Sequence, residues 1–196
     1  MNSSKIIPSD IPERNNYIKV RKDLRKKMVL RKKNRRLNIG PYITVYFENK
    51  DTLIHQIREM VFIENGGHEQ VLEEIRAYES LVPNGKELVL TLMVEIDNQK
   101  KRSEFLSSLG GIECSLILKI NGTSLIKGQA EKDVDRTNAD GKASSVQFIH
   151  FSFNKDEIFL FQSNNSKIEL EIDHPSYKHI AVMNTDVKNE LSKDFL

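Results

Sequence analysis

The sequence predicts an α+β fold in which several helices pack on a mixed, largely antiparallel sheet. Segments with helical and with strand periodicity alternate along the chain, and 38% of its 196 residues are hydrophobic. Two apolar runs flank Asn121-Gly122, a strong signal for a hairpin and therefore for antiparallel pairing. We expect a flexible lead-in over residues 1–16 and a single domain over residues 17–196.

The first predicted element is a basic amphipathic helix. Its apolar residues recur at steps of three and four, which is the spacing of one helix face. They are Tyr17, Val20, Leu24 and Met28. We expect this helix to end near Gly40-Pro41, because glycine and proline stop helices. A strand over 43–47 and helices over 53–64 and 69–80 should follow.

The rest of the chain predicts alternating strands and helices. Residues 88–96 form the best candidate for a central strand, because they are almost continuously apolar. The other predicted elements are a helix from Asp97 or Asn98 to Gly110, the hairpin 115–128, a polar loop 131–144, a strand 146–153, a helix 155–162, a strand 168–172, a weak strand 180–183 and a helix from Thr185.

Positive charge is concentrated near the N-terminus. Residues 19–36 contain 11 of the 30 lysines and arginines but one of the 28 acidic residues, Asp23, so the rest of the chain is net acidic. Such a segment can neutralise phosphates, and Lys22, Lys26, Lys27 and Arg31 are the candidate phosphate contacts. However, only Tyr17 and Asn34 offer an aromatic or amide group for reading bases. The alternative is a helix packed on the acidic body.

Several chemistries lack their motifs. A single cysteine, Cys114, excludes an internal disulfide and multi-cysteine metal sites, and an acid precedes it, so we expect an inert thiol. Glycine-rich phosphate loops are absent. His55 and Glu59 share a helix face, but the chain lacks Glu-x-x-His and His-Glu-x-x-His. We expect no metal, no cofactor, no membrane partner, and a cytoplasmic location, since no apolar run reaches signal-peptide length.

An ordered set of residues resembles an uncharacterised bacterial family, domain of unknown function number 3501. The set spans most of the chain and is specific as a series, although each piece is short. It comprises Lys32-Lys33-Asn34-Arg35-Arg36, Gly40, Thr44, Phe47-Glu48, Thr52, Gln56, Glu59-Met60, Ile63-Glu64, Tyr78, Leu81, Pro83, Gly111-Ile112-Glu113 and Asp173-His174-Pro175-Ser176-Tyr177.

The resemblance implies a setting rather than a mechanism. Genes of the family often lie beside those of rubrerythrin-like and iron–sulfur oxidoreductase proteins, which implies a role in redox or oxidative-stress metabolism. Some residues depart from the family pattern. Lys22, Lys26, Lys27 and Arg31 are additional cations, and His55 and Gln147 replace other residue types.

One candidate site combines polar residues from several predicted elements. Thr52, Gln56 and Glu59 form a polar ridge on one helix, and Arg35 or Arg36 could pair with Glu59 across the core. We predict a cluster that serves as a structural clamp or an anion site. Its members are Arg35, Arg36, Glu48, Gln56, Glu59 and His174.

Three functions follow. The first is a non-enzymatic accessory protein that binds a redox protein. The alternative is a nucleic-acid-binding protein using residues 19–36. The third is a small metal-dependent or acid–base enzyme around His174, whose direction Pro175 restricts; a carboxylate of Glu59, Glu95 or Glu113 would orient the imidazole.

Overall fold

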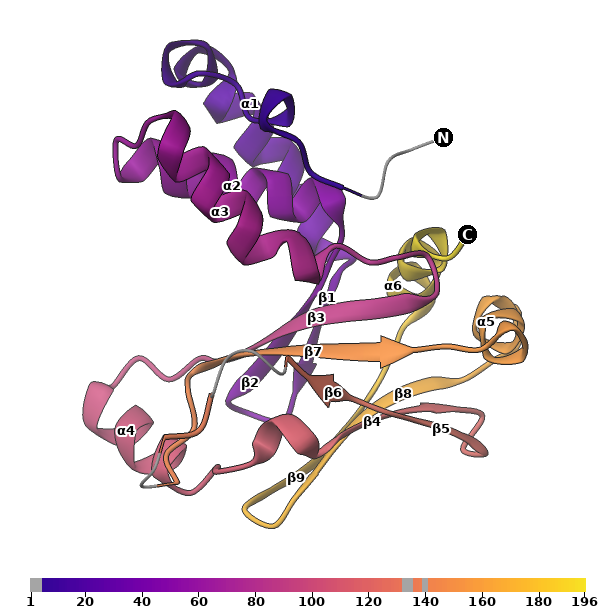
Figure 1. Cartoon of the computed structure of the whole chain (residues 1–196). Helices are drawn as coiled ribbons and strands as arrows, with labels where there is room; N and C mark the ends of the chain where they lie inside the picture. The colour runs from indigo at the N-terminus through magenta and orange to yellow at the C-terminus, as the bar shows by residue number, and fades with distance from the viewer. Residues whose placement is uncertain (1–4, 132–135, 139–140) are drawn as a thin grey trace. The chain divides into compact units, whose positions relative to one another are not determined.

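The computed structural model describes residues 5–131, 136–138 and 141–196. They form two compact units. Unit 1 consists of the residues up to 34 together with 48–84, and unit 2 consists of 35–47 together with 85–196. Figure 1 labels the helices and strands of both. A single domain over residues 17–196 stays a prediction.

Unit 1 is helical. Its α-helices are α1 (Arg14–Lys33), α2 (Lys50–Ile63) and α3 (His68–Tyr78), accompanied by 3-10 turns at Pro8–Asp10 and Glu79–Leu81. α1 packs on α2, and α2 packs on α3 (Figure 1). The buried apolar side chains of the unit are Ile6, Ile11, Tyr17, Leu53, Ile54, Ile57, Val61, Ile75 and Leu81.

The ends of α1 differ from the prediction. The helix begins at Arg14, three residues before Tyr17, and ends at Lys33 rather than near Gly40-Pro41. Residues Arg36–Ile39 form a strand instead, β1, which pairs antiparallel with β2 (Ile43–Glu48). Pairing with β2 satisfies the backbone of this segment, and this outweighs the local preference for helix.

The predicted inward stripe of α1 is also partly wrong. Val20 is exposed, whereas Tyr17 is buried and Leu24 and Met28 are half-buried. Arg21 takes the inward position that the spacing had suggested for Val20. A polar residue in this stripe means that the contact of α1 with α2 is only partly apolar.

The start of α2 is set by a capping box. The side chain of Asn49 accepts a hydrogen bond from the backbone N–H of Thr52 at 3.0 Å, and the Thr52 hydroxyl accepts one from the N–H of Asn49 at 2.9 Å. An N-cap of this kind stabilises a helix by about 1 kcal/mol. The helix therefore begins at Lys50, before the predicted Leu53.

Unit 2 contains two sheets. One has the strand order β1-β2-β3-β7-β6 and the other β5-β4-β8-β9, and every register described between their strands is antiparallel. This confirms the predicted α+β class. The further strands are β3 (Glu87–Val94), β4 (Leu116–Ile120), β5 (Ser124–Lys127), β6 (Gln129–Ala130), β7 (Val146–Ser152), β8 (Ile168–His174) and β9 (Tyr177–Val182).

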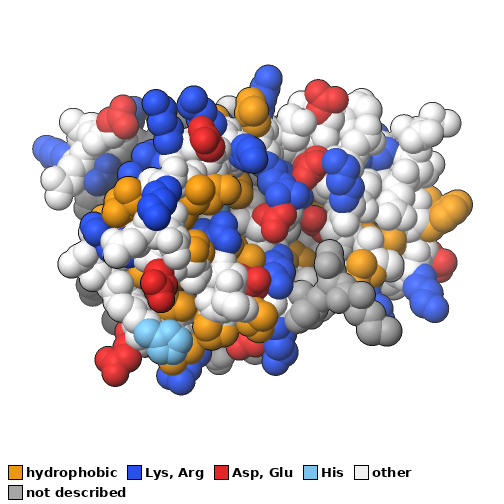
Figure 2. Space-filling model, turned by 90° about the horizontal axis from the view of Figure 1, so that it is seen from above, with side chains coloured by type: hydrophobic (Ala, Val, Ile, Leu, Met, Phe, Trp, Pro, Cys, Tyr) orange, Lys and Arg blue, Asp and Glu red, His pale blue; other side chains and the backbone are white. Residues whose placement is uncertain are grey.

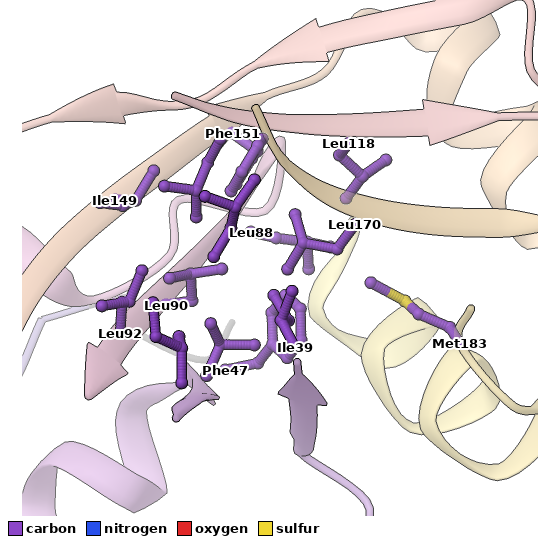
Figure 3. Close-up of a cluster of buried hydrophobic side chains, with 14 of the residues drawn as sticks. Ile39, Phe47, Leu88, Leu90, Leu92, Leu118, Ile149, Phe151, Leu170 and Met183 are labelled. Carbon is purple, nitrogen blue, oxygen red and sulfur yellow. The ribbon is translucent and has the colours of Figure 1, made fainter. Parts of the chain in front are cut away.

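The core of unit 2 lies between the inner faces of these sheets. Figure 3 shows side chains from one sheet, such as Leu90 and Phe151, pointing toward Leu118 and Leu170 of the other. Burial alternates along β4 and β8, as expected for strands with one face on a core. The alternation excludes a register shift by one residue, because such a shift would expose the apolar set.

Local signals account for the connections in unit 2. β4 and β5 pair around Asn121 and Gly122, both of which have positive φ (53° and 71°), as a tight hairpin turn requires. The helices are α4 (Gln99–Ser107), α5 (Lys155–Gln162) and α6 (Thr185–Leu191). The predicted loop 131–144 lies partly outside the described residues. Among the helices that are described, none has both the length and the apolar character of a membrane span.

Candidate functional site

The exposed surface of α1 combines apolar and basic side chains. Val29 is 70% exposed and Leu30 is 72% exposed, although both lie near the C-terminal end of a helix that also packs on α2. Ile18 is exposed further along the same face. Large exposed apolar side chains that gather on one face usually mark a binding surface.

These side chains border a groove that we call the basic-apolar groove. It has a volume of about 830 Å³ and lies entirely within unit 1. Its lining residues are Ile18, Arg21, Lys22, Arg25, Lys26, Val29 and Leu30 of α1 and Phe62 of α2. Figure 2 shows lysine and arginine side chains lying among hydrophobic ones on the surface. The groove therefore offers an apolar floor with a positively charged border.

Phe62 is the residue that α2 contributes to the lining of the groove. The guanidinium groups of Arg14 and Arg21 lie over its ring, 4.9 and 4.3 Å from the centroid, and Tyr17 meets it edge-on. Cation–π contacts of this kind favour a fixed position for both arginines. The ring is thus engaged by the protein's own side chains.

Glu59 organises the adjoining contact between α1 and α2. Its carboxylate accepts hydrogen bonds from the Tyr17 hydroxyl at 2.7 Å and from Nε and Nη2 of Arg21 at 2.9 and 2.8 Å. The bonds from Arg21 hold the pKa of Glu59 below its usual value. Burial, reinforced by Glu59, raises the pKa of Tyr17. The contact between Arg21 and Glu59 is bidentate and charge-assisted.

The partners of Glu59 correct the predicted cluster. The carboxylate is occupied by Tyr17 and Arg21 rather than by Arg35 or Arg36, and Arg25 lies 3.9 Å away. The predicted inward stripe of apolar residues does not include Arg21, which the structure places against α2. Three members of the cluster also belong to unit 1 (Glu48, Gln56 and Glu59), and the other three belong to unit 2.

Arg35 forms a buried ion pair in unit 2. Its Nη1 lies 3.1 Å from Oδ1 of Asp194, a second bond joins Nη2 to Oδ2, and Nε donates to the carbonyl oxygen of Phe47 at 2.9 Å. Glu190 lies 3.6 Å away. Arg36 instead is exposed and donates to the side chain of Asn38. The two neighbouring arginines thus have separate roles.

Glu48 and Gln56 each have a partner within unit 1. The buried carboxylate of Glu48 accepts a hydrogen bond of 2.5 Å from the hydroxyl of Thr52, one turn into α2. Gln56 is exposed and donates to the Tyr78 hydroxyl at 3.4 Å. Both contacts hold neighbouring elements of the unit together.

His174 is fully engaged by the backbone. The N–H of Ser176 donates to Nδ1 at 3.2 Å, so Nε2 carries the proton and donates to the carbonyl oxygen of Gly110 at 3.1 Å. Both ring nitrogens are therefore occupied without a carboxylate. The predicted orienting acids have other contacts: Glu59 bonds Tyr17, Glu95 accepts from Thr44, and Glu113 accepts from Thr137. The imidazole holds the turn between β8 and β9.

The four candidate phosphate contacts divide between two places. Lys22 and Lys26 line the basic-apolar groove, whereas Lys27 and Arg31 line a smaller cavity between α1 and α2. Arg31 forms an exposed ion pair with Asp51. His55 also lines this cavity, and its partial burial lowers its pKa.

Two further candidate features are a metal site and the single cysteine. Within the described residues, no three His, Cys, Asp or Glu side chains are grouped so as to hold a metal ion. Cys114 is exposed in a 3-10 turn that precedes β4.

The sequence analysis did not predict the basic-apolar groove. Ile18, Lys22, Arg25 and Val29 nevertheless follow helical spacing and could have revealed a second face of α1.

Comparisons with known proteins agree with the sequence resemblance. The family described as "Protein of unknown function (DUF3501)" matches residues 5–195. A crystal structure of a novel protein of unknown function from Burkholderia pseudomallei K96243 is similar to this chain, with a TM-score of 0.90 and 28% sequence identity over 98% of this chain and 100% of that chain. No curated protein matches. The chain therefore belongs to the DUF3501 family of proteins of unknown function.

Proposed function

We propose that this protein is a non-enzymatic accessory factor that binds another protein through the basic-apolar groove. The occupant that fits the groove is an acidic amphipathic helix of the partner. The observation that carries the proposal is the exposure of Val29 and Leu30, at 70% and 72%, between the cations of α1. An apolar floor with a basic border is complementary to an apolar stripe with an acidic border.

The dimensions of the groove suit a helix. From Ile18 to Leu30 the groove follows α1 for about 18 Å, at 1.5 Å per residue. A partner helix of about three turns would match this length. Burying one exposed Val or Leu side chain completely contributes about 1.5–3 kcal/mol. The apolar floor therefore supplies affinity, while the charges select the partner.

The cations of the border are available to a partner's acids. Among the residues that the structure describes, no acid lies within ion-pair distance of Lys22 or Lys26, and Asp23 is the one acid in residues 19–36. Arg25 lies 3.9 Å from Glu59 and is itself more than half exposed. Complementary charges of this kind accelerate association and discriminate against basic partners.

A nucleic acid would use this surface less completely. Phosphates would engage the lysines, but Val29 and Leu30 would meet no apolar surface on a phosphate backbone. Single-stranded binding requires aromatic rings on which bases stack, and Arg14 and Arg21 already lie over the ring of Phe62. Nucleic-acid binding is therefore measured alongside peptide binding in the test described below.

The proposed setting comes from the family resemblance. Its gene neighbourhood implies a partner in redox or oxidative-stress metabolism, and we propose a redox protein that presents the acidic helix. The groove accounts for binding, and the resemblance accounts for the class of partner. The two parts of the proposal can be tested separately.

The first test measures binding of a labelled peptide by fluorescence anisotropy. The peptide is a stapled helix with a leucine stripe and glutamates on both flanks, and its control has the same composition with the stripe scrambled. Labelled single- and double-stranded DNA and RNA are titrated in parallel over a salt series. We expect the striped peptide to bind about ten-fold more tightly than the scrambled one.

Matched variants locate the binding site. The double variant Val29→Ser/Leu30→Ser removes the apolar floor, and Val20→Ser/Ile63→Ser removes two exposed apolar side chains that do not line the groove. We expect only the first to weaken peptide binding. Equal loss in both variants, or nucleic-acid binding with a steep salt dependence that neither variant changes, would overturn the proposal.

The second test concerns the partner's class. Immobilised wild type and both double variants are incubated with an extract of cells that produce the protein, and retained proteins are identified by mass spectrometry. A redox protein retained by wild type and by Val20→Ser/Ile63→Ser, but not by Val29→Ser/Leu30→Ser, is the expected result. Retention of a groove-dependent partner from outside redox metabolism would keep the docking site and reject the setting.

A further inference from the structure

A second, smaller cavity lies on a different face of α1, between this helix and α2. It has a volume of about 260 Å³, and we call it the interhelix cavity. It belongs wholly to unit 1 and shares no lining residue with the basic-apolar groove. Its volume is below the range of pockets for drug-sized ligands, so it suits a small molecule.

Positive charge dominates the interhelix cavity. Lys27, Arg31 and Arg58 line it together with a single acid, Asp51, which is ion-paired with Arg31. The lining of the cavity thus carries three cations against one acid. Clustered cations around a partly enclosed space raise the local concentration of anions.

Arg58 is the best positioned of these cations. Its Nε and Nη2 both donate to one backbone oxygen, the carbonyl of Asp10, at 3.2 and 2.5 Å. Within the described part of the chain, no carboxylate lies at ion-pair distance from its guanidinium. The carboxylate of Asp10 lies 3.2 Å from the ammonium group of Lys50 instead. Its Nη1 makes no hydrogen bond to any described residue. Burial lowers the pKa of Arg58, consistent with a cation that is partly withdrawn from water.

The remaining lining residues indicate an organic ligand. Leu24 and Met28 of α1 and Ile54 of α2 form the apolar part of the wall. His55, which is partly buried, adds a ring nitrogen that can form a hydrogen bond. A ligand that satisfies both parts of the wall needs an anionic group and a short apolar body.

We propose that the interhelix cavity binds a small organic anion whose phosphate or carboxylate group accepts hydrogen bonds from Arg58 and an ionic contact from Lys27. Guanidinium groups bind such planar or tetrahedral oxyanions in bidentate fashion. The apolar body of the ligand lies against Leu24, Met28 and Ile54. This inference does not depend on the proposed protein partner, because the two sites use different residues of α1.

The test uses the full chain and four probes: inorganic phosphate, butyl phosphate, butyrate and butanol. Binding is measured by calorimetry, and amide shifts in the NMR spectrum locate it. We expect butyl phosphate or butyrate to bind about ten-fold more tightly than inorganic phosphate, and butanol not to bind. Whichever of the two organic anions binds more tightly identifies the head group. Affinity for inorganic phosphate equal to that for the tighter-binding organic anion would overturn the assignment to an organic anion.

Three variants assign the binding to this cavity. Arg58→Gln should reduce affinity about ten-fold and Lys27→Gln about three-fold, whereas Lys22→Gln, a lysine of the same helix that lines the groove, should leave it unchanged. If Arg58→Gln does not fold, Lys27→Gln still decides, because its side chain is exposed. Binding that is unchanged in Lys27→Gln, or weakened equally in Lys22→Gln, would overturn the proposal, as would no binding of either organic anion at millimolar concentration.

Discussion

An arginine–carboxylate pair in each unit shows how the two parts of the molecule differ. In unit 2 the side chains of Arg35 and Asp194 are 1% and 7% exposed, whereas in unit 1 those of Arg21 and Glu59 are 26% and 18% exposed. A pair withdrawn from water leaves an uncompensated buried charge when one partner is lost, while a pair in contact with water can be solvated instead. Loss of one partner should therefore destabilise the protein more for the pair in unit 2 than for the pair in unit 1.

The apolar side chains show the same contrast. Unit 2 buries a continuous cluster between its sheets, although it also exposes single apolar side chains such as Phe159 at 75%. In unit 1 the exposed Val29 and Leu30 instead line one groove together with cations of the same helix. The difference is therefore in how the exposed apolar side chains are grouped, since singly exposed ones are normal on a protein surface.

The largest effect is expected from a cavity in the core of unit 2. Phe161 is fully buried, with its ring 5.7 Å from that of Phe153 and 5.4 Å from that of Phe195. Phe161→Ala should lower the free energy of unfolding by about 4 kcal/mol. Phe159→Ala, which removes a 75% exposed ring from the same helix, should change it by less than about 0.5 kcal/mol.

Urea unfolding followed by circular dichroism compares the two phenylalanine variants. Unfolding of both at the same urea concentration would show that the aromatic cluster of unit 2 does not control stability. Burial of an aromatic ring in unit 2 would then contribute no more to the free energy of unfolding than an exposed ring does.

A smaller loss is expected when the buried ion pair is broken. Asp194→Asn removes the nearer of the two carboxylates beside Arg35 and should destabilise the protein by about 3 kcal/mol, because the guanidinium stays buried with only Glu190 near it. Asp173→Asn is the control, since this carboxylate pairs with Lys178 at the surface and its loss should leave the urea midpoint almost unchanged. Similar midpoints for both variants would mean that burial does not distinguish these pairs.

The smallest effect is expected at Glu59, and it depends on pH. Arg21 lowers the pKa of Glu59 in the folded protein. The ionised carboxylate therefore stabilises the fold fully above its unfolded-state pKa of about 4.3. This contribution to the free energy of unfolding is lost as the pH falls through the lower folded-state pKa. Glu59→Gln should therefore lower the urea midpoint at neutral pH. Its difference from wild type should shrink as the pH falls from about 6 to about 3.

The control for Glu59 is Glu73→Gln, which changes an exposed acid on α3 of the same unit. Its urea midpoint should follow that of wild type throughout the pH series. A difference between Glu59→Gln and wild type that stays constant with pH would show that ionisation of Glu59 does not stabilise the contact between α1 and α2.

Local patterns predicted the elements more reliably than the contacts between them. The helix predicted over residues 155–162 is observed as α5, because its capping box of Asn154 and Glu157 depends on residues three positions apart. By contrast, the sequence predicts that the first helix continues to about Gly40, whereas residues 36–39 form β1. Its strand conformation depends on pairing with β2, which no pattern within residues 36–39 reveals.

The candidate site shows the limit of sequence reasoning more clearly. The sequence predicts that Glu59 pairs with Arg35 or Arg36, but its partner is Arg21, 38 positions earlier among several neighbouring cations. Nothing local distinguishes Arg21 from Arg25 or Lys22. Helix packing places Arg21 against α2 and leaves the others on the outer face, and the same packing creates the groove and the cavity.

The sequence by itself determined the α+β class, the order of most elements, the basic character of α1 and membership of the family. These properties depend on periodicity, composition and short motifs, which act over a few residues. Only the tertiary structure decided that Arg35 pairs with Asp194, 159 positions away, and which face of α1 stays exposed. Such contacts arise when distant elements bury their apolar faces together, so the choice among chemically equivalent side chains is made by packing.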